Sequence, residues 1–288
     1  IWLKSAGAPG AQARARLRWR MRKKLVLEVG ARGRLCKRPA ARYPAPRTPG
    51  DSAGMASAAR AAPKPPDSTA AEAAHSAMEA HVLDEYGDFA DHYEETLRGY
   101  GYVSDREGPA MVKEALEARQ RQGGEPQGPW RILDLGCGTG NTSVPFFEEP
   151  GRYAVVGVDL TPEMVEKAKE RPFEQVLCQN IEKELQVDDA SFDVVQFIGV
   201  CEFLNFPLQT FAMARRKLRE NGLLLLTSPV KISASFERKY KIKTWARGEL
   251  EGMVAKAGFV QVSTKAFPAY QLGDVAVQYE GSVWRRVE

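Results

Sequence analysis

A glycine-rich turn directly after a buried strand limits the possible folds of this chain more than any other segment. The segment ILDLGCGTGNT, residues 132–142, starts as a short apolar run and then places Gly136, Gly138 and Gly140 at alternate positions. Glycine allows positive φ there, and it lets a ligand approach the backbone with no Cβ in the way. The residues that follow can start a helix, whose first N–H groups attract a small anion. We therefore predict that a strand, a turn and a helix together form a binding site.

Strand-like and helix-like segments alternate through the rest of the chain. We expect strands at 131–135, 153–159, 173–179, 192–200 and 223–229, and helices at 109–122, 161–170, 208–221 and 246–258. This alternation favours right-handed crossovers and a parallel sheet with helices on both faces. The last two strand-like segments, FVQVSTKAF and VAVQYEGSVW, have no helix between them, so we expect an antiparallel hairpin at one edge. The predicted fold class is α/β, with a doubly wound mixed sheet.

Basic residues are concentrated near the start of the chain. Residues 1–60 contain 15 Lys and Arg but only two acids, Glu28 and Asp51, whereas residues 61–288 contain 26 basic and 35 acidic residues. The patterned part is therefore acidic, which argues against a nucleic-acid partner. The longest apolar run, residues 222–227, is far shorter than the ~20 residues of a membrane span. We expect neither a nucleic-acid partner nor a membrane span.

The basic segment itself is rich in Ala, Arg, Pro and Gly. We expect residues 1–75 to be a disordered tail and residues 76–288 to be the folded domain. Three interpretations of the tail stay open: an Arg-rich transit peptide, which implies an organellar location, a polybasic arm for anionic partners, or sequence upstream of the native start. We favour the third, because the chain begins with Ile1 and Met55 opens the plausible start MASAARAAPKPPDS. A cytoplasmic location is then expected.

The cysteines do not form a metal-binding pattern. Cys36, Cys137, Cys178 and Cys201 lie at least 23 residues apart, and none belongs to a Cys-x-x-Cys or Cys/His pair with zinc-site spacing. We expect reduced thiols and no metal.

Two acidic residues frame the glycine-rich turn. Asp134 precedes the turn, and Asp159 ends the next strand along the chain. The spacing G-x-G-x-G differs from the dinucleotide fingerprint G-x-G-x-x-G, and a carboxylate about 4 Å from a phosphate would repel it by roughly 4 kcal/mol at an effective dielectric of 20. A headgroup with an ammonium beside its carboxylate fits better, and Asp159 can accept the hydroxyls of a free ribose. An amino acid headgroup, a free ribose and an apolar adenine slot together describe S-adenosylmethionine.

The same residues carry a family resemblance. The turn resembles motif I of the class I S-adenosylmethionine-dependent methyltransferases, and GVDLTPEMVEKAKE resembles their next motif. The resemblance extends from about residue 86 to residue 267, and this segment is similar to the methyltransferase type 11 domain. It implies a Rossmann-like sheet of seven strands in the order 3-2-1-4-5-7-6, and methyl transfer by in-line displacement. The segment EYGDFADHYEETLRGYGY resembles the amino-terminal element of methyltransferases with small-molecule acceptors. Its end, LRGYGY, is similar to the subgroup that includes the methyltransferase-like protein of the Williams–Beuren syndrome region.

The resemblance assigns the cofactor-binding residues. Asn180 is expected to face the exocyclic amine of adenine, and the amide of Ile181 a ring nitrogen. The segment 196–200 replaces the N/D-P-P-Y sequence of enzymes that methylate planar amide or adenine nitrogens, which argues against those acceptors. The expected cofactor-binding residues are Tyr86, Tyr93, Asp134, Gly136, Cys137, Gly138, Thr139, Gly140, Asp159, Leu160, Asn180 and Ile181.

No catalytic residue stands out in the sequence. Tyr93, His92 and Glu202 are candidates, although His92 and Glu202 are more typical of solvated or capping positions. Tyr86, Phe89 and Tyr93 share one helical face, which is either core or a lid over a sulfonium. We expect a methyltransferase with a small-molecule acceptor. The alternatives are a protein or RNA methyltransferase and a catalytically silent S-adenosylmethionine-binding interaction protein, and both a monomer and a homodimer stay open.

Overall fold

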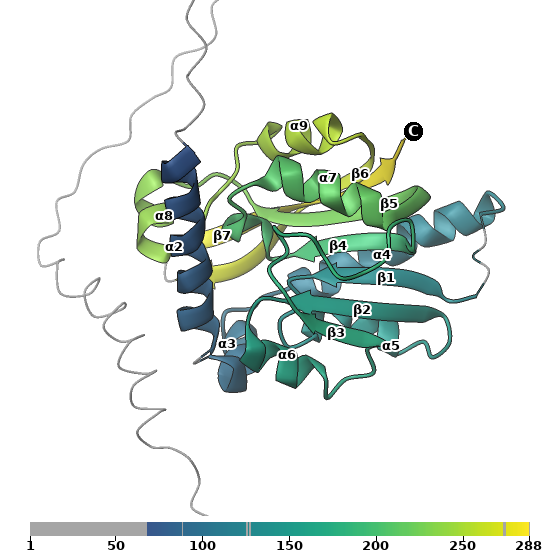
Figure 1. Ribbon diagram of the computed structural model, residues 1–288, viewed down its shortest axis with the longest axis horizontal. Helices are drawn as coiled ribbons and strands as arrows, with labels where there is room; N and C mark the ends of the chain where they lie inside the picture. Colours follow the sequence, from purple (N-terminus) through teal and green to yellow (C-terminus); the bar gives the residue numbers. More distant parts are fainter. Residues whose placement is uncertain (1–67, 88, 125, 127, 273–274, 288) are drawn as a thin grey trace, which may run out of the picture. The chain divides into compact units, whose positions relative to one another are not determined.

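Seven strands form one sheet in the order β3-β2-β1-β4-β5-β7-β6 (Figure 1). The computed structural model describes residues 68–87, 89–124, 126, 128–272 and 275–287. Strands β1 to β5 run parallel, and β7 pairs antiparallel with both β5 and β6. The predicted fold class, strand order and edge hairpin are confirmed. The strands are β1 (Trp130–Leu135), β2 (Tyr153–Asp159), β3 (Gln175–Cys178), β4 (Phe192–Ile198), β5 (Leu218–Pro229), β6 (Phe259–Leu272) and β7 (Val275–Arg286).

Helices cover both faces of the sheet. Because successive side chains of a strand point to opposite faces, β1 contributes to two cores. Ile132 packs on the side of α4 and α5, whereas Leu133 packs on the side of α7 and α9. The helical elements are α2 (Ser68–Gly87), η1 (Ala90–His92), α3 (Tyr93–Gly99), α4 (Ser104–Arg121), η2 (Asn141–Ser143), α5 (Val144–Phe147), α6 (Pro162–Ala168), η3 (Cys201–Phe203), α7 (Pro207–Lys217), α8 (Ala234–Tyr240) and α9 (Glu249–Lys256).

The boundary between α7 and β5 differs from the prediction. The sequence favoured a helix over 208–221 that Gly222 ends, but α7 ends at Lys217 and β5 begins at Leu218. Leu218 pairs with Phe192 of β4, and its side chain is fully buried. Pairing with a neighbouring strand and burial of Leu218 therefore outweigh the helical pattern of the local sequence.

The start of the first helix also differs from the expected domain boundary. Helix α2 begins at Ser68, before residue 76, where we expected the folded domain to start. Residues 1–67, which make up most of the predicted tail, lie outside the described part of the chain.

Lys217, the last residue of α7, anchors the loop between β3 and β4. Its side chain is 3% exposed, and its ammonium lies 2.7 Å from a carboxylate oxygen of Asp189 and 3.1 Å from one of Glu184. The ammonium also donates to the carbonyls of Leu185 and Val187. The same loop carries Asn180 and Ile181 at its start.

We expect Lys217→Ala to lower the free energy of unfolding by about 1–3 kcal/mol, because buried acceptors lose their donor. Urea unfolding followed by circular dichroism measures this change. Arg216→Ala is the matched control, because the neighbouring Arg216 also pairs with Glu184 but is exposed, and its loss should change stability little. Equal effects of the two variants would contradict an anchoring role for Lys217.

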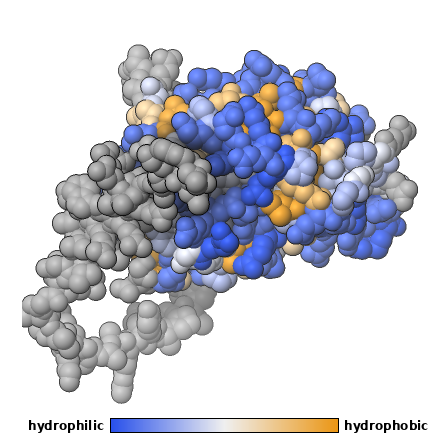
Figure 2. Space-filling view, turned by 90° about the horizontal axis from the view of Figure 1, so that it is seen from below, coloured by the Kyte–Doolittle hydropathy of each residue, from blue (hydrophilic) through white to orange (hydrophobic). Residues whose placement is uncertain are grey.

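We compared the hydropathy of the surface and of the helices with what a membrane-spanning segment requires. The face in Figure 2 is mostly hydrophilic, with smaller groups of hydrophobic residues between. Among the described residues, no helix has both the length and the apolar character that crossing a membrane requires.

Candidate functional site

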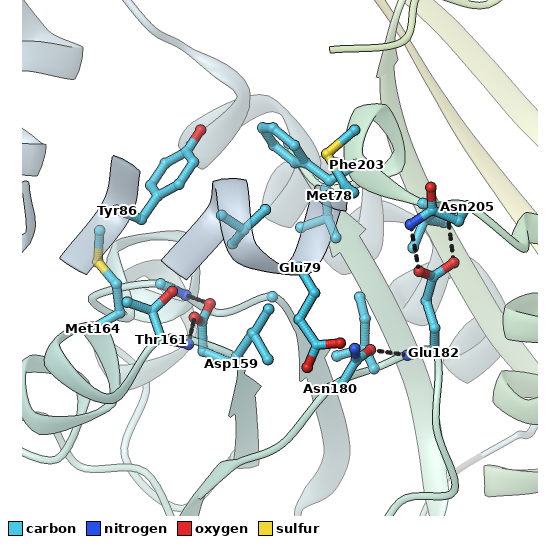
Figure 3. Close-up of a pocket in the computed structure, with 18 of the residues that line it drawn as sticks. Met78, Glu79, Tyr86, Asp159, Thr161, Met164, Asn180, Glu182, Phe203 and Asn205 are labelled. Atoms are coloured by element: carbon cyan, nitrogen blue, oxygen red, sulfur yellow. Dashed lines mark hydrogen bonds between the residues drawn. The ribbon is translucent and has the colours of Figure 1, made fainter. Parts of the chain in front are cut away.

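A pocket opens at the carboxyl ends of β1, β2 and β4, beneath helix α2 (Figure 3). Its volume is about 770 Å³, counting the open space at its mouth. In open parallel sheets, ligands bind at this edge, where loops follow the strands. Eight of the predicted cofactor-binding residues line the pocket: Tyr86, Tyr93, Gly136, Gly138, Asp159, Leu160, Asn180 and Ile181.

The glycine-rich turn is fixed against β2 by backbone hydrogen bonds. The amides of Gly136 and Cys137 donate to the carbonyl of Val158, at 2.7 and 3.0 Å. Gly136, Gly138 and Gly140 all have positive φ, as the sequence predicted. A Cβ at Gly138 would meet only the ring of Tyr93, at 3.7 Å, so this position leaves the backbone open to the pocket.

Asp159 joins the turn to the loop after β2. Its Oδ2 accepts from the amide of Gly138 at 2.8 Å, and its Oδ1 accepts from the amide of Thr161 at 2.9 Å. Burial raises the pKa of this carboxyl, and the two amide bonds oppose the shift. Each carboxylate oxygen can accept more than one hydrogen bond, so Asp159 can still accept from a ligand hydroxyl in the pocket.

Four of the predicted cofactor-binding residues do not line the pocket. Asp134 is fully buried, and its Oδ2 accepts from the hydroxyls of Thr142 and Ser143, so it holds the turn together. Cys137 is buried, and burial raises the pKa of its thiol well above the ordinary value. A Cβ at Gly140 would lie 2.6 Å from the ring of Phe173, which shows that this glycine faces the protein.

Thr139, the fourth of these residues, ties the turn to helix α3. Its hydroxyl donates to Glu94 at 2.7 Å, and its carbonyl accepts from Arg171 at 2.8 Å. Arg171 also pairs with Glu94, at 2.5 Å. This network holds α3, and with it Tyr93, against the turn.

The helix after the turn is shorter than the sequence suggested. The turn leads into η2 and then into α5, which has only four residues, Val144–Phe147. So short a helix contributes little dipole at the turn. Binding at this position therefore depends on the open glycine backbone and on Asp159 rather than on a helix terminus.

The loop after β3 forms another wall of the pocket. The side-chain oxygen of Asn180 accepts from the amide of Glu182 at 2.9 Å, so it shapes the loop as well as lining the pocket (Figure 3). Glu182 in turn accepts from the amides of Asn205 and Phe206, at 2.7 and 2.6 Å. These bonds join the loops that follow β3 and β4.

Helix α2 covers the pocket, and besides Tyr86 its pocket-lining residues were not identified from the sequence. Met78, Val82 and Tyr86 follow one another at four-residue spacing and all face the pocket, and the Glu79 carboxylate extends from α2 toward Asn180 (Figure 3). The four-residue spacing was the signal in the sequence, since it places these side chains on one helical face. The pocket-lining residues that were missed are Met78, Glu79, Val82, Thr161, Met164, Glu182, Gly199, Val200, Phe203, Leu204 and Asn205.

An aromatic cluster closes the pocket beside α2. The Tyr86 ring lies 5.7 Å from that of Phe203 and 6.1 Å from that of Tyr93, in edge-to-face geometry. Phe89 packs against Tyr86 and Tyr93 but does not line the pocket. The aromatic stripe is therefore both packing and pocket wall.

The three catalytic candidates occupy different positions. Tyr93 lines the pocket, and burial raises the pKa of its phenol well above the ordinary value, so it stays protonated at neutral pH. His92 is the N-cap residue of α3 and does not line the pocket. Glu202 is 5% exposed and lies in η3, directly before the pocket-lining Phe203.

Glu202 makes stability depend on pH. Burial raises the pKa of its carboxyl to about 7, whereas an unfolded Glu titrates near pH 4.3. The folded protein thus holds this proton more tightly, so the stabilisation is complete below about pH 4.3 and is lost as pH rises toward 7.

Glu202→Gln keeps an acceptor for Tyr279 but cannot ionise. Between pH 5 and pH 8 we expect the wild type to lose about 3 kcal/mol more unfolding free energy than this variant, measured by urea unfolding. Equal losses would contradict the assignment.

Comparisons with known proteins agree with the fold. The family model of the methyltransferase domain matches residues 133–226. The malonyl-(acyl-carrier protein) O-methyltransferase of Halalkalibacterium halodurans is 29% identical over 136 residues, 45% of this chain and 49% of that protein. The aklanonic acid methyltransferase DauC of Streptomyces sp. strain C5 is 35% identical over 123 residues, 39% of this chain and 54% of that protein. The chain spans about half the length of the curated relatives it matches.

A solved structure has the same fold. The 1,6-didemethyltoxoflavin-N1-methyltransferase of Burkholderia thailandensis, crystallised with 1,6-didemethyltoxoflavin and S-adenosylhomocysteine, superposes with a TM-score of 0.57. The match covers 79% of this chain and 94% of that one, at 18% identity.

The sheet order and the turn between β1 and η2 define a Rossmann-like methyltransferase fold. Residues 133–226 resemble a methyltransferase domain, and the sheet around them has the methyltransferase fold. The similarity of residues 97–102 to the Williams–Beuren subgroup stays a prediction.

Proposed function

We propose that this protein transfers the methyl group of S-adenosylmethionine to a small-molecule acceptor. The observation that carries the proposal is the position of Asp159 in the pocket wall, between the open backbone of Gly138 and the loop at Asn180 and Ile181. A carboxylate next to an open glycine turn suits a nucleoside that carries an amino acid group, because it accepts from hydroxyls and does not attract a phosphate.

The residues present fit this cofactor. Asp159 would accept from the ribose hydroxyls, and Gly138 would leave room for the amino acid part. Ile181 offers an apolar contact for the adenine beside Asn180. Asp134, Cys137, Thr139 and Gly140 would act indirectly, by fixing the shape of the turn.

The proposed catalysis is mainly positioning. S-adenosylmethionine, when bound, supplies a methyl group on a cationic sulfur. Tyr86, Tyr93 and Phe203 line the same pocket and would exclude water from it, and aromatic ring faces attract a positive charge by about 0.5–2 kcal/mol. Holding two reacting atoms about 3–3.5 Å apart in line accounts for much of such a rate enhancement.

The class of acceptor rests on the relatives. Those compared above are named for a malonyl group on an acyl-carrier protein, for aklanonic acid and for 1,6-didemethyltoxoflavin. Their acceptors differ from one another, which supports a small-molecule acceptor without selecting one of them. The free thiols of Cys137, Cys178 and Cys201 are compatible with the cytoplasmic location that we propose alongside.

Calorimetry followed by a turnover assay tests the proposal. We expect S-adenosylmethionine and S-adenosylhomocysteine to bind the full chain with one site each. Incubation with a metabolite extract and S-adenosylmethionine should then yield S-adenosylhomocysteine and one metabolite heavier by a methyl group in mass spectrometry. Tight binding with no methylated product from metabolite, protein or RNA fractions would indicate a silent cofactor-binding protein. A lack of binding would contradict the proposal as a whole.

A further inference from the structure

A buried carboxyl beside the pocket has one oxygen without a partner. Tyr279 donates its phenol hydrogen to Oε1 of Glu202 at 2.5 Å. Oε2 of Glu202 is buried and has no hydrogen-bond partner in the described part of the chain. A buried polar atom without a partner is costly, typically by about 1–3 kcal/mol, so it suggests that a ligand group completes this position.

Five tyrosines from five segments lie near this carboxyl, and we name them the tyrosine cluster. Burial raises the pKa of each phenol, and the charge of Glu202 raises it further. The rings contact one another, with centroids 6.1 Å apart for Tyr102 and Tyr270 and 5.7 Å apart for Tyr270 and Tyr279. The tyrosine cluster consists of Tyr86 of α2, Tyr93 of α3, Tyr102 before α4, Tyr270 of β6 and Tyr279 of β7.

The tyrosine cluster adjoins the pocket. Tyr86 and Tyr93 line the pocket directly. Gly199 also lines it, and a Cβ at Gly199 would lie 2.5 Å from the Tyr102 hydroxyl, so that hydroxyl lies against the pocket wall. Glu202 itself lies in the short η3 segment, next to the pocket-lining Phe203.

The charges at this wall are negative. Among the described residues, those that line the pocket include the acids Glu79, Asp159 and Glu182 but no Lys, Arg or His. Lys243, near the same wall, donates its ammonium to the carbonyl of Leu204. Burial raises the pKa of the Glu202 carboxyl, and hydrogen bonding by Tyr279 and by the backbone of Glu202 itself opposes this shift. No cation of the described residues contributes to it.

Building on the proposed function, we propose that the methyl acceptor is an amine that is protonated in solution, and that its nitrogen binds against the tyrosine cluster, with Glu202 as counter-charge and proton acceptor. Aromatic faces attract a cation, and a carboxylate without a cationic partner gains most from one. A carboxylate acceptor would meet the acids Glu79, Asp159 and Glu182 in the pocket lining, so its binding is disfavoured.

The proposed step balances in atoms and charge. The ammonium gives one proton to Oε2 of Glu202, and the nitrogen lone pair becomes free. That lone pair forms the new bond to the methyl carbon, while the bond from this carbon to sulfur breaks and its electron pair stays on sulfur. The products are the methylated ammonium, the neutral thioether S-adenosylhomocysteine and a proton, which Glu202 returns to solvent.

This role predicts a pH dependence of amine binding. The titratable groups near Glu202 are the five phenols, which stay protonated below pH 9, and the thiol of Cys201, whose pKa burial raises well above its ordinary value. Lys243 is also near, because its amide donates to the Glu202 carbonyl; burial lowers the pKa of its ammonium, which donates to the carbonyl of Leu204. Glu202, with a pKa of about 7, is thus the group that changes charge near neutrality. Binding of a cation favours the ionised carboxylate, so affinity should rise as pH increases through about 7 and then level off.

The experiment compares probes that share one apolar group and carry a cationic, a neutral or an anionic headgroup. The protein is first titrated with S-adenosylhomocysteine. The loaded protein is then titrated with three 2-phenylethyl compounds, phenethylamine, 2-phenylethanol and 3-phenylpropanoate, and with the corresponding n-hexyl set. We expect at least one amine to bind more than about 10-fold tighter than its alcohol, and neither carboxylate to bind. From pH 6 to pH 8 the amine affinity should rise severalfold.

Two variants separate a role in recognition from a structural one. Glu202→Gln keeps an acceptor for Tyr279, and should remove both the preference for the amine and its pH dependence while the alcohol binds as before. Tyr279→Phe removes a bond that favours the ionised carboxylate, so the midpoint of the pH dependence should move to higher pH. A purely structural Glu202 would leave the midpoint in place.

The outcomes distinguish the two proposals. If S-adenosylhomocysteine does not bind, the proposed function fails and the acceptor inference fails with it. If it binds but no amine is preferred over its alcohol, or Glu202→Gln retains the preference, only the amine inference is overturned. Binding of a carboxylate probe in place of the amine would also overturn it.

Discussion

Replacing Gly138 with valine is expected to reduce affinity for S-adenosylmethionine by more than about 100-fold, or roughly 2.7 kcal/mol. Gly138 has φ of +54° and lines the pocket, and an added Cβ would meet only the Tyr93 ring at 3.7 Å. The valine methyl groups would therefore occupy the space that we assign to the cofactor. Calorimetry with S-adenosylhomocysteine measures the loss, and circular dichroism reports whether the fold is kept.

Backbone strain must be separated from this steric effect, because valine at positive φ is itself unfavourable by about 1–3 kcal/mol. Gly151→Val is the matched control: Gly151 has φ of +80°, an added Cβ there has open space, and the residue does not line the pocket. We expect a similar loss of stability in both variants and a loss of binding in Gly138→Val alone. If Gly138→Val binds like the control, the cofactor does not contact this turn.

The fold could be predicted from local hydrophobic patterns, because in most segments these patterns agree with the packing in the structure. The strands β1, β2 and β4 are mostly apolar segments with glycine-rich or polar segments after them, so their positions could be predicted from the sequence. The boundary of α7 was not, because residues 218–221 continue a helical pattern. Leu218 instead joins β5, since its backbone pairs with Phe192, which lies far away in sequence.

The sequence predicted those parts of the candidate site that a single strand end and the loop after it form. Gly138, Asp159 and Leu160 lie at such ends and do line the pocket. We expected Asp134 to bind the cofactor, but its carboxylate accepts hydrogen bonds from the hydroxyls of Thr142 and Ser143. A motif gives the position of an acid along the chain, and the geometry of the turn decides what that acid contacts.

The surroundings of Glu202 could not be read from the sequence. Its pKa depends on burial by elements that are distant along the chain, such as Tyr86 of α2 and Tyr279 of β7. Local sequence made Glu202 look like a solvated residue after β4. Only the tertiary arrangement brings the aromatic rings around it and removes the water that would otherwise hold its pKa near the ordinary value.

Asp159→Ala is expected to weaken S-adenosylmethionine binding by about 1–3 kcal/mol, or about 5- to 150-fold. The ligand hydroxyls would lose their acceptor, and the amides of Gly138 and Thr161 would lose theirs. The second loss also lowers the free energy of unfolding by about 1–3 kcal/mol, since buried donors are left unpaired. Calorimetry and urea unfolding measure the two effects on the same preparations.

A second buried aspartate separates these two effects. Asp193 of β4 is 2% exposed, accepts from the amide of Arg131 at 2.9 Å and from the side chain of Arg219 at 3.0 Å, and does not line the pocket. Asp193→Ala should therefore cost stability like Asp159→Ala but leave cofactor affinity unchanged. Because both variants lose a carboxylate that holds backbone amides or side chains in place, a difference in affinity isolates the contact with the ligand. Equal affinity in the two variants would show that Asp159 only shapes the turn, and the ribose assignment would fail.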